Sequence, residues 1–205
     1  MEYKYTFIHP TKSGGTALEK YFKNNYSDYI IGCGHDNICK DDNNPIIVVR
    51  DVKTRFYSMY KYWKNGAIDG NYKRDKEWLE KNKNVSVFDF INLLKTNKTK
   101  LYSGFTWSDH FSNTTRWIHP NINYKNLIII KYEKDLDKKI HKILNILCIK
   151  DKNIPVPHIN VSNIENCEYD LDDKDVNEFI NEYFSSDIKL IDKIDNNPEL
   201  FKIVI

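Results

Sequence analysis

The chain has 205 residues, and its 31 Lys and Arg residues against 29 Asp and Glu residues give a formal net charge of +2. This length suits one domain with a full hydrophobic core, and the near balance of charge argues against a polyanion-binding surface, so nucleic acid is not an expected partner. Apolar runs stay shorter than the roughly 18 residues of a membrane span, and Met1 runs directly into the first predicted strand, so we expect a cytoplasmic protein without a signal peptide or membrane anchor.

A strand, a glycine-containing turn and a helix are predicted at the start of the chain. Residues 3–7 alternate between aromatic and polar side chains, as strands do, and apolar residues recur at helical spacing over 18–22. Between them lies the segment His9 to Ala17, which we call the glycine loop. Its two adjacent glycines allow a tight turn in which successive N–H groups point at one anion, and Lys12 adds a positive charge. The pattern predicts a phosphate site; the alternative is a plain glycine turn without a ligand.

The residue order in the glycine loop differs from the usual nucleotide-triphosphatase loop, in which the lysine follows the glycines. It resembles the 5′-phosphosulfate loop of sulfotransferases that use 3′-phosphoadenosine 5′-phosphosulfate (PAPS), in particular the carbohydrate type similar to heparan sulfate 2-O-sulfotransferases. The matching positions are His9, Lys12, Ser13, Gly14, Gly15 and Thr16, and Thr11 stands where the family usually has proline. The resemblance implies that Lys12 is catalytic. It also implies that the donor is bound by Lys12, Ser13, Gly14, Gly15, Thr16 and Ala17.

A second predicted strand, near residues 29–31, leads into a glycine-flanked histidine, His35. A histidine at the carboxyl end of a strand lies where open α/β sheets bind ligands, and its ordinary pKa suits proton abstraction near neutral pH. The segment also resembles the Gly-His segment of uronyl-type carbohydrate sulfotransferases, in which that histidine is the catalytic base. The resemblance gives His35 this role, and the alternative is a polar surface residue.

Four cysteines are irregularly spaced, at Cys33, Cys39, Cys148 and Cys167. We expect free thiols in a reducing compartment. A metal site built from Cys33, His35 and Cys39 matches no zinc spacing and lacks a clear fourth ligand, so we expect no metal.

The β-branched run from Pro45 to Val49 predicts a strand buried on both faces, followed by a helix. On that geometry Arg50 leaves the strand end and Ser58 lies further along the helix, so both can reach one phosphate. The spacing Arg-Asp-x-x-x-Arg-x-x-Ser-x-Tyr resembles the 3′-phosphate element of sulfotransferases, with Lys53 replacing a frequent proline. The resemblance implies that Arg50 and Ser58 bind the donor's 3′-phosphate.

A helix N-capped by Ser86 is predicted next, with Phe90, Leu93 and Leu94 facing inward. An aromatic segment over residues 107–118 follows it and contains His110 and Arg116. His110 and Arg116 are candidates for the acceptor site, because carbohydrate sulfotransferases carry a histidine in the corresponding segment. The alternative is that both are partly buried structural groups.

The last third of the chain predicts a buried strand over 127–133 and a helix over 135–149. These resemble the family's Tyr-Glu-x-Leu element, here Tyr132 and Glu133, which we interpret as scaffold. The loop Pro157-His158-Ile159-Asn160-Val161-Ser162 resembles a Pro-His-x-Asn-x-Ser loop near the donor nucleotide, which implies that Asn160 and Ser162 bind the donor. The segment 183–191 resembles the family's closing helix.

Alternating strands and helices predict one α/β domain over residues 1–205, with a P-loop-type, mainly parallel sheet and helices on both faces. The resemblance implies a PAPS-dependent sulfotransferase that needs no metal and acts on a hydroxyl, expected on a carbohydrate. Two alternatives stay open. One is an ATP-dependent P-loop phosphotransferase, and the other is a catalytically inactive nucleotide-binding protein of the same fold.

Overall fold

The computed structural model describes residues 5–32, 34, 38, 44–64, 86–96, 111–132, 135–157 and 173–205. The chain groups into two compact units. The first contains Met1–Asp51, Asn113–Cys167 and Ser186–Ile205, and the second contains Val52–Ser112 and Glu168–Ser185. Within the described ranges, every helix is too short or too polar to cross a membrane.

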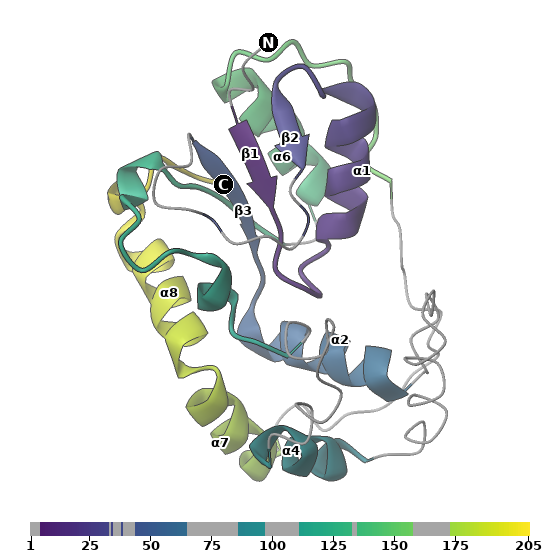
Figure 1. The fold of residues 1–205 in the computed structure, drawn as a ribbon, viewed down its shortest axis with the longest axis vertical. Helices are drawn as coiled ribbons and strands as arrows, with labels where there is room; N and C mark the ends of the chain where they lie inside the picture. The colour runs from purple at the N-terminus through teal and green to yellow at the C-terminus, as the bar shows by residue number, and fades with distance from the viewer. Residues whose placement is uncertain are drawn as a thin grey trace. The chain divides into compact units, whose positions relative to one another are not determined.

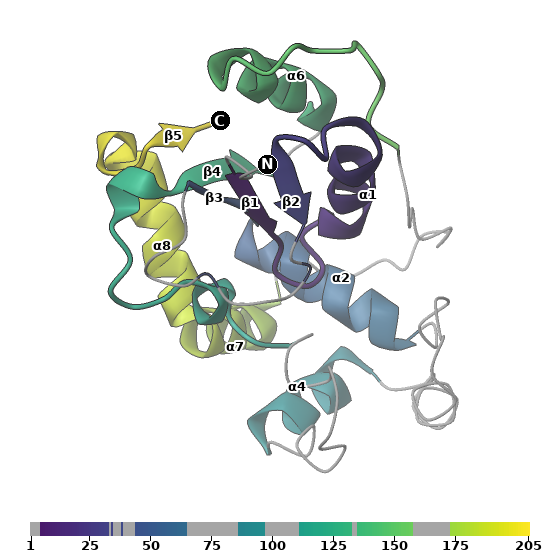
Figure 2. The same cartoon turned by 45° about the horizontal axis from the view of Figure 1, so that its top comes forward.

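The first unit is built on a five-stranded sheet (Figure 1 and Figure 2). Its strands are β1 (Tyr5–Ile8), β2 (Ile30–Gly32), β3 (Pro45–Val49), β4 (Ile128–Lys131) and β5 (Ile203–Val204). They lie in the order β2-β1-β3-β4-β5, and all four pairings are parallel, with Ile47 of β3 between Ile8 of β1 and Ile129 of β4. The predicted parallel sheet is confirmed. Strand β5 was not predicted, because two residues are too few to show a pattern.

Helices cover both faces of this sheet, as predicted (Figure 2). Ile46 and Val48 of β3 belong to a buried cluster with α1 (Gly15–Asn25) and α6 (Leu136–Ile146). The alternate residues of β3, Ile47 and Val49, belong to a second cluster with α8 (Ser185–Asn196). Successive side chains of a strand point to opposite faces, so one β-branched run supplies both layers of the core.

Short 3-10 turns complete the first unit. They are η2 (Thr114–Trp117), η3 (Tyr124–Asn126) and η4 (Pro198–Leu200). Of these, η2 carries Arg116.

The second unit contains α2 (Val52–Lys64), α4 (Val87–Lys95) and α7 (Lys174–Tyr183). The ring of Phe56 on α2 lies 5.8 Å from that of Phe90 on α4 and 5.9 Å from that of Phe179 on α7, measured between centroids. The predicted start of α4 is confirmed: the Ser86 hydroxyl accepts the N–H of Asp89, and the Asp89 carboxylate accepts the N–H of Ser86. The three helices therefore join through an aromatic core.

The inward face of α4 differs by one residue from the expectation. Phe90 and Leu94 are buried as predicted, but Ile91 is buried in place of Leu93, which is half-buried. The apolar stripe thus runs through positions i, i+1 and i+4. Helical spacing alone does not decide whether Ile91 or Leu93 joins Phe90 and Leu94 on this stripe.

Candidate functional site

The strand order places a topological switch point between β1 and β3. The chain leaves β1 toward β2 on one side of the sheet and later returns to β3 on the other side. In open α/β sheets ligands bind outside the carboxyl ends of the strands at such a point. The glycine loop leaves the end of β1 and Arg50 follows the end of β3, so both lie at this edge (Figure 1).

The glycine loop folds back on itself before α1 begins. Lys12 and Gly14 have positive backbone φ angles of 61° and 81°, and a positive φ is uncommon for a residue other than glycine. Ser13 is buried, and both its N–H and its hydroxyl donate to the carbonyl of Pro10. The hydroxyl of Ser13 thus shapes the loop, and a direct contact of Ser13 with a ligand stays a prediction.

The N-terminus of α1 has no side-chain cap among the described residues. Its N-cap residue is Gly14, and its first turn contains no acidic residue. By contrast, Ser86 caps α4 and Asp173 caps α7 through their side chains. The first N–H groups of a helix lack partners inside the helix and carry the positive end of its dipole, so this end can accept an anion.

Arg50 is tied to the glycine loop. Its Nη1 donates to the carbonyl oxygen of Lys12 at 3.1 Å, and its guanidinium lies 5.0 Å from the centroid of the Tyr132 ring. Burial lowers the pKa of Arg50 from its ordinary value, while the nearby Tyr132 and Asp51 act in the opposite direction. Arginine keeps its charge in proteins, and a partly desolvated charge attracts an anion more strongly than a hydrated one does.

Tyr132, interpreted as scaffold from the sequence, is a member of this site. It directly follows β4, and its N–H donates to the carbonyl of Val49 at 2.7 Å. A β-carbon at Gly14 would lie 2.2 Å from Cε2 of Tyr132, so only glycine fits against this ring. The rule that placed Arg50 at the carboxyl end of β3 would also have placed Tyr132 at the end of the neighbouring strand.

The structure brings together part of the predicted site. Lys12 and Arg50 are in contact, and Thr16 is exposed in the first turn of α1, with the buried Gly15 and Ala17 on either side. Ser58 lies on α2 in the second unit, so its convergence with Arg50 stays a prediction. The remaining predicted site residues lie outside the described residues: His35, His110, Asn160 and Ser162.

The chain on either side of His35 is anchored by backbone hydrogen bonds. The N–H of His9 donates to the carbonyl of Gly34 at 3.1 Å, and the N–H of Ile38 donates to the carbonyl of Trp117 at 2.8 Å. The first anchor is at the end of β1, and the second is at η2, which also carries the exposed Arg116. The segment predicted to carry the base is thus fixed at both ends to elements that carry predicted ligand groups.

Comparisons with known proteins do not identify a family for this chain, since searches with protein-family models, curated proteins and solved structures find no match. Among the described residues, no group of three or more His, Cys, Asp or Glu side chains could hold a metal ion. The chemistry of the site therefore has to be argued from its own residues.

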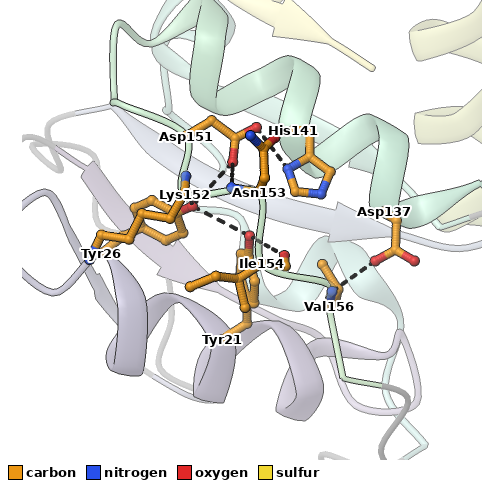
Figure 3. A network of polar contacts seen from close by, with 9 residues as sticks. All are labelled: Tyr21, Tyr26, Asp137, His141, Asp151, Lys152, Asn153, Ile154 and Val156. Atoms are coloured by element: carbon orange, nitrogen blue, oxygen red, sulfur yellow. Dashed lines mark hydrogen bonds and ion pairs between the residues drawn. The ribbon is translucent and has the colours of Figure 1, made fainter.

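A second polar cluster lies in the first unit, around Asp151 (Figure 3). The Asp151 carboxylate accepts the N–H of Asn153 at 2.8 Å and pairs with Nδ1 of His141 at 2.8 Å. The hydroxyl of Tyr26 donates to it at 3.4 Å. Burial by itself raises the pKa of Asp151, but these hydrogen bonds outweigh it, and the pKa lies below its ordinary value of 3.8.

This cluster anchors the segment after α6. The Tyr21 hydroxyl donates to the carbonyl of Ile154 at 3.0 Å, and the N–H of Val156 donates to Asp137 at 2.9 Å (Figure 3). Side chains from α1 and α6 thus hold residues 151–156 at several points. We interpret the cluster as structural support for the chain that leads into the predicted Pro-His-x-Asn-x-Ser loop.

The lowered pKa of Asp151 predicts a pH-dependent contribution to stability. A carboxyl group whose pKa is depressed by folding stabilises the protein above its unfolded pKa and loses this effect as the pH falls through its folded pKa. Urea unfolding should therefore show wild type to be more stable than Asp151→Asn at about pH 5 and above. The difference should shrink below pH 3.8. The exposed Asp28 provides the control Asp28→Asn, and an equal pH trend in both variants would contradict the prediction.

Proposed function

We propose that the protein is a sulfotransferase that moves a sulfuryl group from PAPS to a hydroxyl acceptor, expected on a carbohydrate. The observation that carries the proposal is the hydrogen bond from Arg50 to the carbonyl of Lys12. It joins the residue proposed for the donor's 3′-phosphate to the loop proposed for its 5′-phosphosulfate. The 3′-phosphate and the 5′-phosphosulfate are attached to the same ribose, so the side chains that bind them have to lie close together.

The proposed roles follow from how charge moves during the transfer. The acceptor oxygen forms a bond to sulfur while the bond between sulfur and the 5′-phosphate oxygen breaks, which leaves negative charge on the phosphate. Lys12 and the first N–H groups of α1 would stabilise that charge, as in phosphoryl transfer, where positioning and electrostatics dominate. His35 would take the proton of the acceptor hydroxyl. Arg50 and Ser58 would select a nucleotide with a 3′-phosphate.

Arg116 is the described candidate for the acceptor side. It is exposed on η2, close in the chain to the carbonyl of Trp117 that holds Ile38. Ile38 follows His35 by three residues. This link supports the proposal that His35, as the base, and Arg116, as an acceptor-binding residue, lie on two segments joined by the hydrogen bond between Ile38 and Trp117. His110 is a further candidate for binding the acceptor.

Calorimetric titration with adenosine 3′,5′-bisphosphate tests the donor assignment. We expect wild type to bind this nucleotide more tightly than ATP or AMP, without added magnesium. Arg50→Ala should weaken binding by about 1.5–3 kcal/mol because charged hydrogen bonds are lost, and Lys12→Ala should also weaken it. Lys23→Ala is the matched control, because Lys23 is an exposed lysine at the far end of α1 and should bind as wild type does.

The same titration separates the alternatives. Tighter binding of ATP with magnesium, unaffected by Arg50→Ala, would favour the phosphotransferase and rule out the proposal. An inactive nucleotide-binding protein would bind the bisphosphate but release none from PAPS over a panel of mono- and oligosaccharide acceptors. For an active enzyme, His35→Ala should abolish this release while leaving bisphosphate binding intact.

A further inference from the structure

The side chain of His9 lies directly against the first residue of α1. A β-carbon at Gly15 would be 1.9 Å from Cγ of His9 and 2.0 Å from its Cβ. The side chain of His9 is 3% exposed, so this contact is closed to solvent. The second glycine of the glycine loop is therefore explained by the imidazole beneath it, and the first by Tyr132.

Glu19 holds this imidazole from one turn further along α1. Its Oε2 lies 3.3 Å from Nε2 of His9, and its side chain is 31% exposed. Glu19 also fills the space at the end of β2, where a β-carbon on Gly32 would lie 2.8 Å from its Cγ. The pair thus spans from the end of β1 to the first two turns of α1 and abuts β2.

We propose that His9 and Glu19 are a positioning pair that aims the N-terminus of α1 at the donor's 5′-phosphate. The inference rests on the proposed function, because it assumes that the first N–H groups of α1 bind this phosphate. Between His9 and α1 two residues, Lys12 and Gly14, have a left-handed backbone conformation, and α1 has no side-chain cap among the described residues to fix its start. The His9–Glu19 contact ties the helix to the strand across this segment. Donors aimed at an anion act only within a narrow range of distance and direction, so a small tilt of α1 weakens them.

Two nucleotides distinguish positioning from simple packing. Adenosine 3′,5′-bisphosphate carries the 5′-phosphate, and adenosine 3′-monophosphate lacks it. His9→Leu fills the same space but loses the hydrogen bond to Glu19. We expect about tenfold weaker binding of the bisphosphate, because a tilted α1 would lose about one charged hydrogen bond to the 5′-phosphate. Binding of the monophosphate should stay within about twofold of wild type. His9→Gln, which can place an amide near Nε2, should recover most of the lost bisphosphate affinity.

Gly32→Ala gives a second test that changes no charge near the anion. Its β-carbon would push the Glu19 side chain away from His9, so bisphosphate affinity should again fall several fold with monophosphate affinity retained. Unchanged bisphosphate binding in His9→Leu and Gly32→Ala would overturn the positioning role, and so would an equal loss for both nucleotides. If wild type does not bind the bisphosphate more tightly than ATP or AMP, the donor assignment fails, and the measurement on wild type alone shows this.

Discussion

Replacing Asp187 by alanine is expected to lower the free energy of unfolding by about 3–4 kcal/mol, because two backbone N–H groups lose a charged acceptor. Asp187 lies in α8 with 1% of its surface exposed. Its Oδ2 accepts the N–H of Thr114 at 2.6 Å, and its Oδ1 accepts the N–H of Thr115 at 3.0 Å. Urea unfolding followed by circular dichroism measures the change. These N–H groups open η2, so the variant should also loosen the turn that carries Arg116.

Two variants make this prediction specific. Asp187→Asn keeps one acceptor oxygen and should lose about half as much stability, since a neutral acceptor is weaker than a charged one. Asp192→Ala removes an exposed aspartate from the same helix and should stay within about 0.5 kcal/mol of wild type. A loss of the same size at Asp187 and Asp192 would mean that the cap on η2 contributes little.

The contact of Asp187 with η2 could not be predicted from the sequence. The segment 183–191 was expected to form a helix, and α8 begins at Ser185. Nothing in the pattern indicates that the buried aspartate reaches a turn more than 70 residues earlier in the chain, because the contact depends on tertiary packing. The buried strands and the helix α1 were predictable for the opposite reason: each carries its own repeat of apolar residues over several positions.

Boundaries were less predictable than elements. The helix expected over 135–149 ends at Ile146, because Cys148 adopts a positive φ of 57°. The N–H of Ile149 then donates to the carbonyl of Leu144, which closes the helix end in the usual left-handed way. A glycine at that position would have signalled the end, and a cysteine gives no such signal.

The candidate site shows the same difference between local sequence patterns and tertiary contacts. The glycines and Lys12 predicted an anion site from local sequence, and Arg50 was placed from its position after a buried strand. The partners that hold these groups were missed: Tyr132 against Gly14, and His9 with Glu19 against Gly15. Each is a contact between residues whose separate patterns look structural. The local sequence thus pointed to the candidate anion-binding groups but not to the side chains that pack against them.

Gly14→Ala is expected to lower the free energy of unfolding by about 3 kcal/mol, as the sum of two effects. The positive φ of 81° costs a β-carbon about 1–2 kcal/mol, and the clash with the Tyr132 ring adds about 1–3 kcal/mol of overpacking. The ring can relieve the clash only by moving, and the guanidinium of Arg50 lies over it at 5.0 Å. We therefore expect bisphosphate affinity to fall by more than about tenfold in the same variant, since Arg50 would move with the ring.

Gly34 supplies the matched control for this last prediction. It too has a positive φ, of 58°, but the nearest described atom to a β-carbon there is Oε1 of Glu19 at 3.7 Å, an ordinary contact. Gly34→Ala should therefore show the backbone cost alone, about 1–2 kcal/mol. The difference between the two alanine variants in urea unfolding isolates the contact with Tyr132. If both variants lose equal stability and both bind the bisphosphate as wild type does, then Tyr132 does not couple the glycine loop to Arg50.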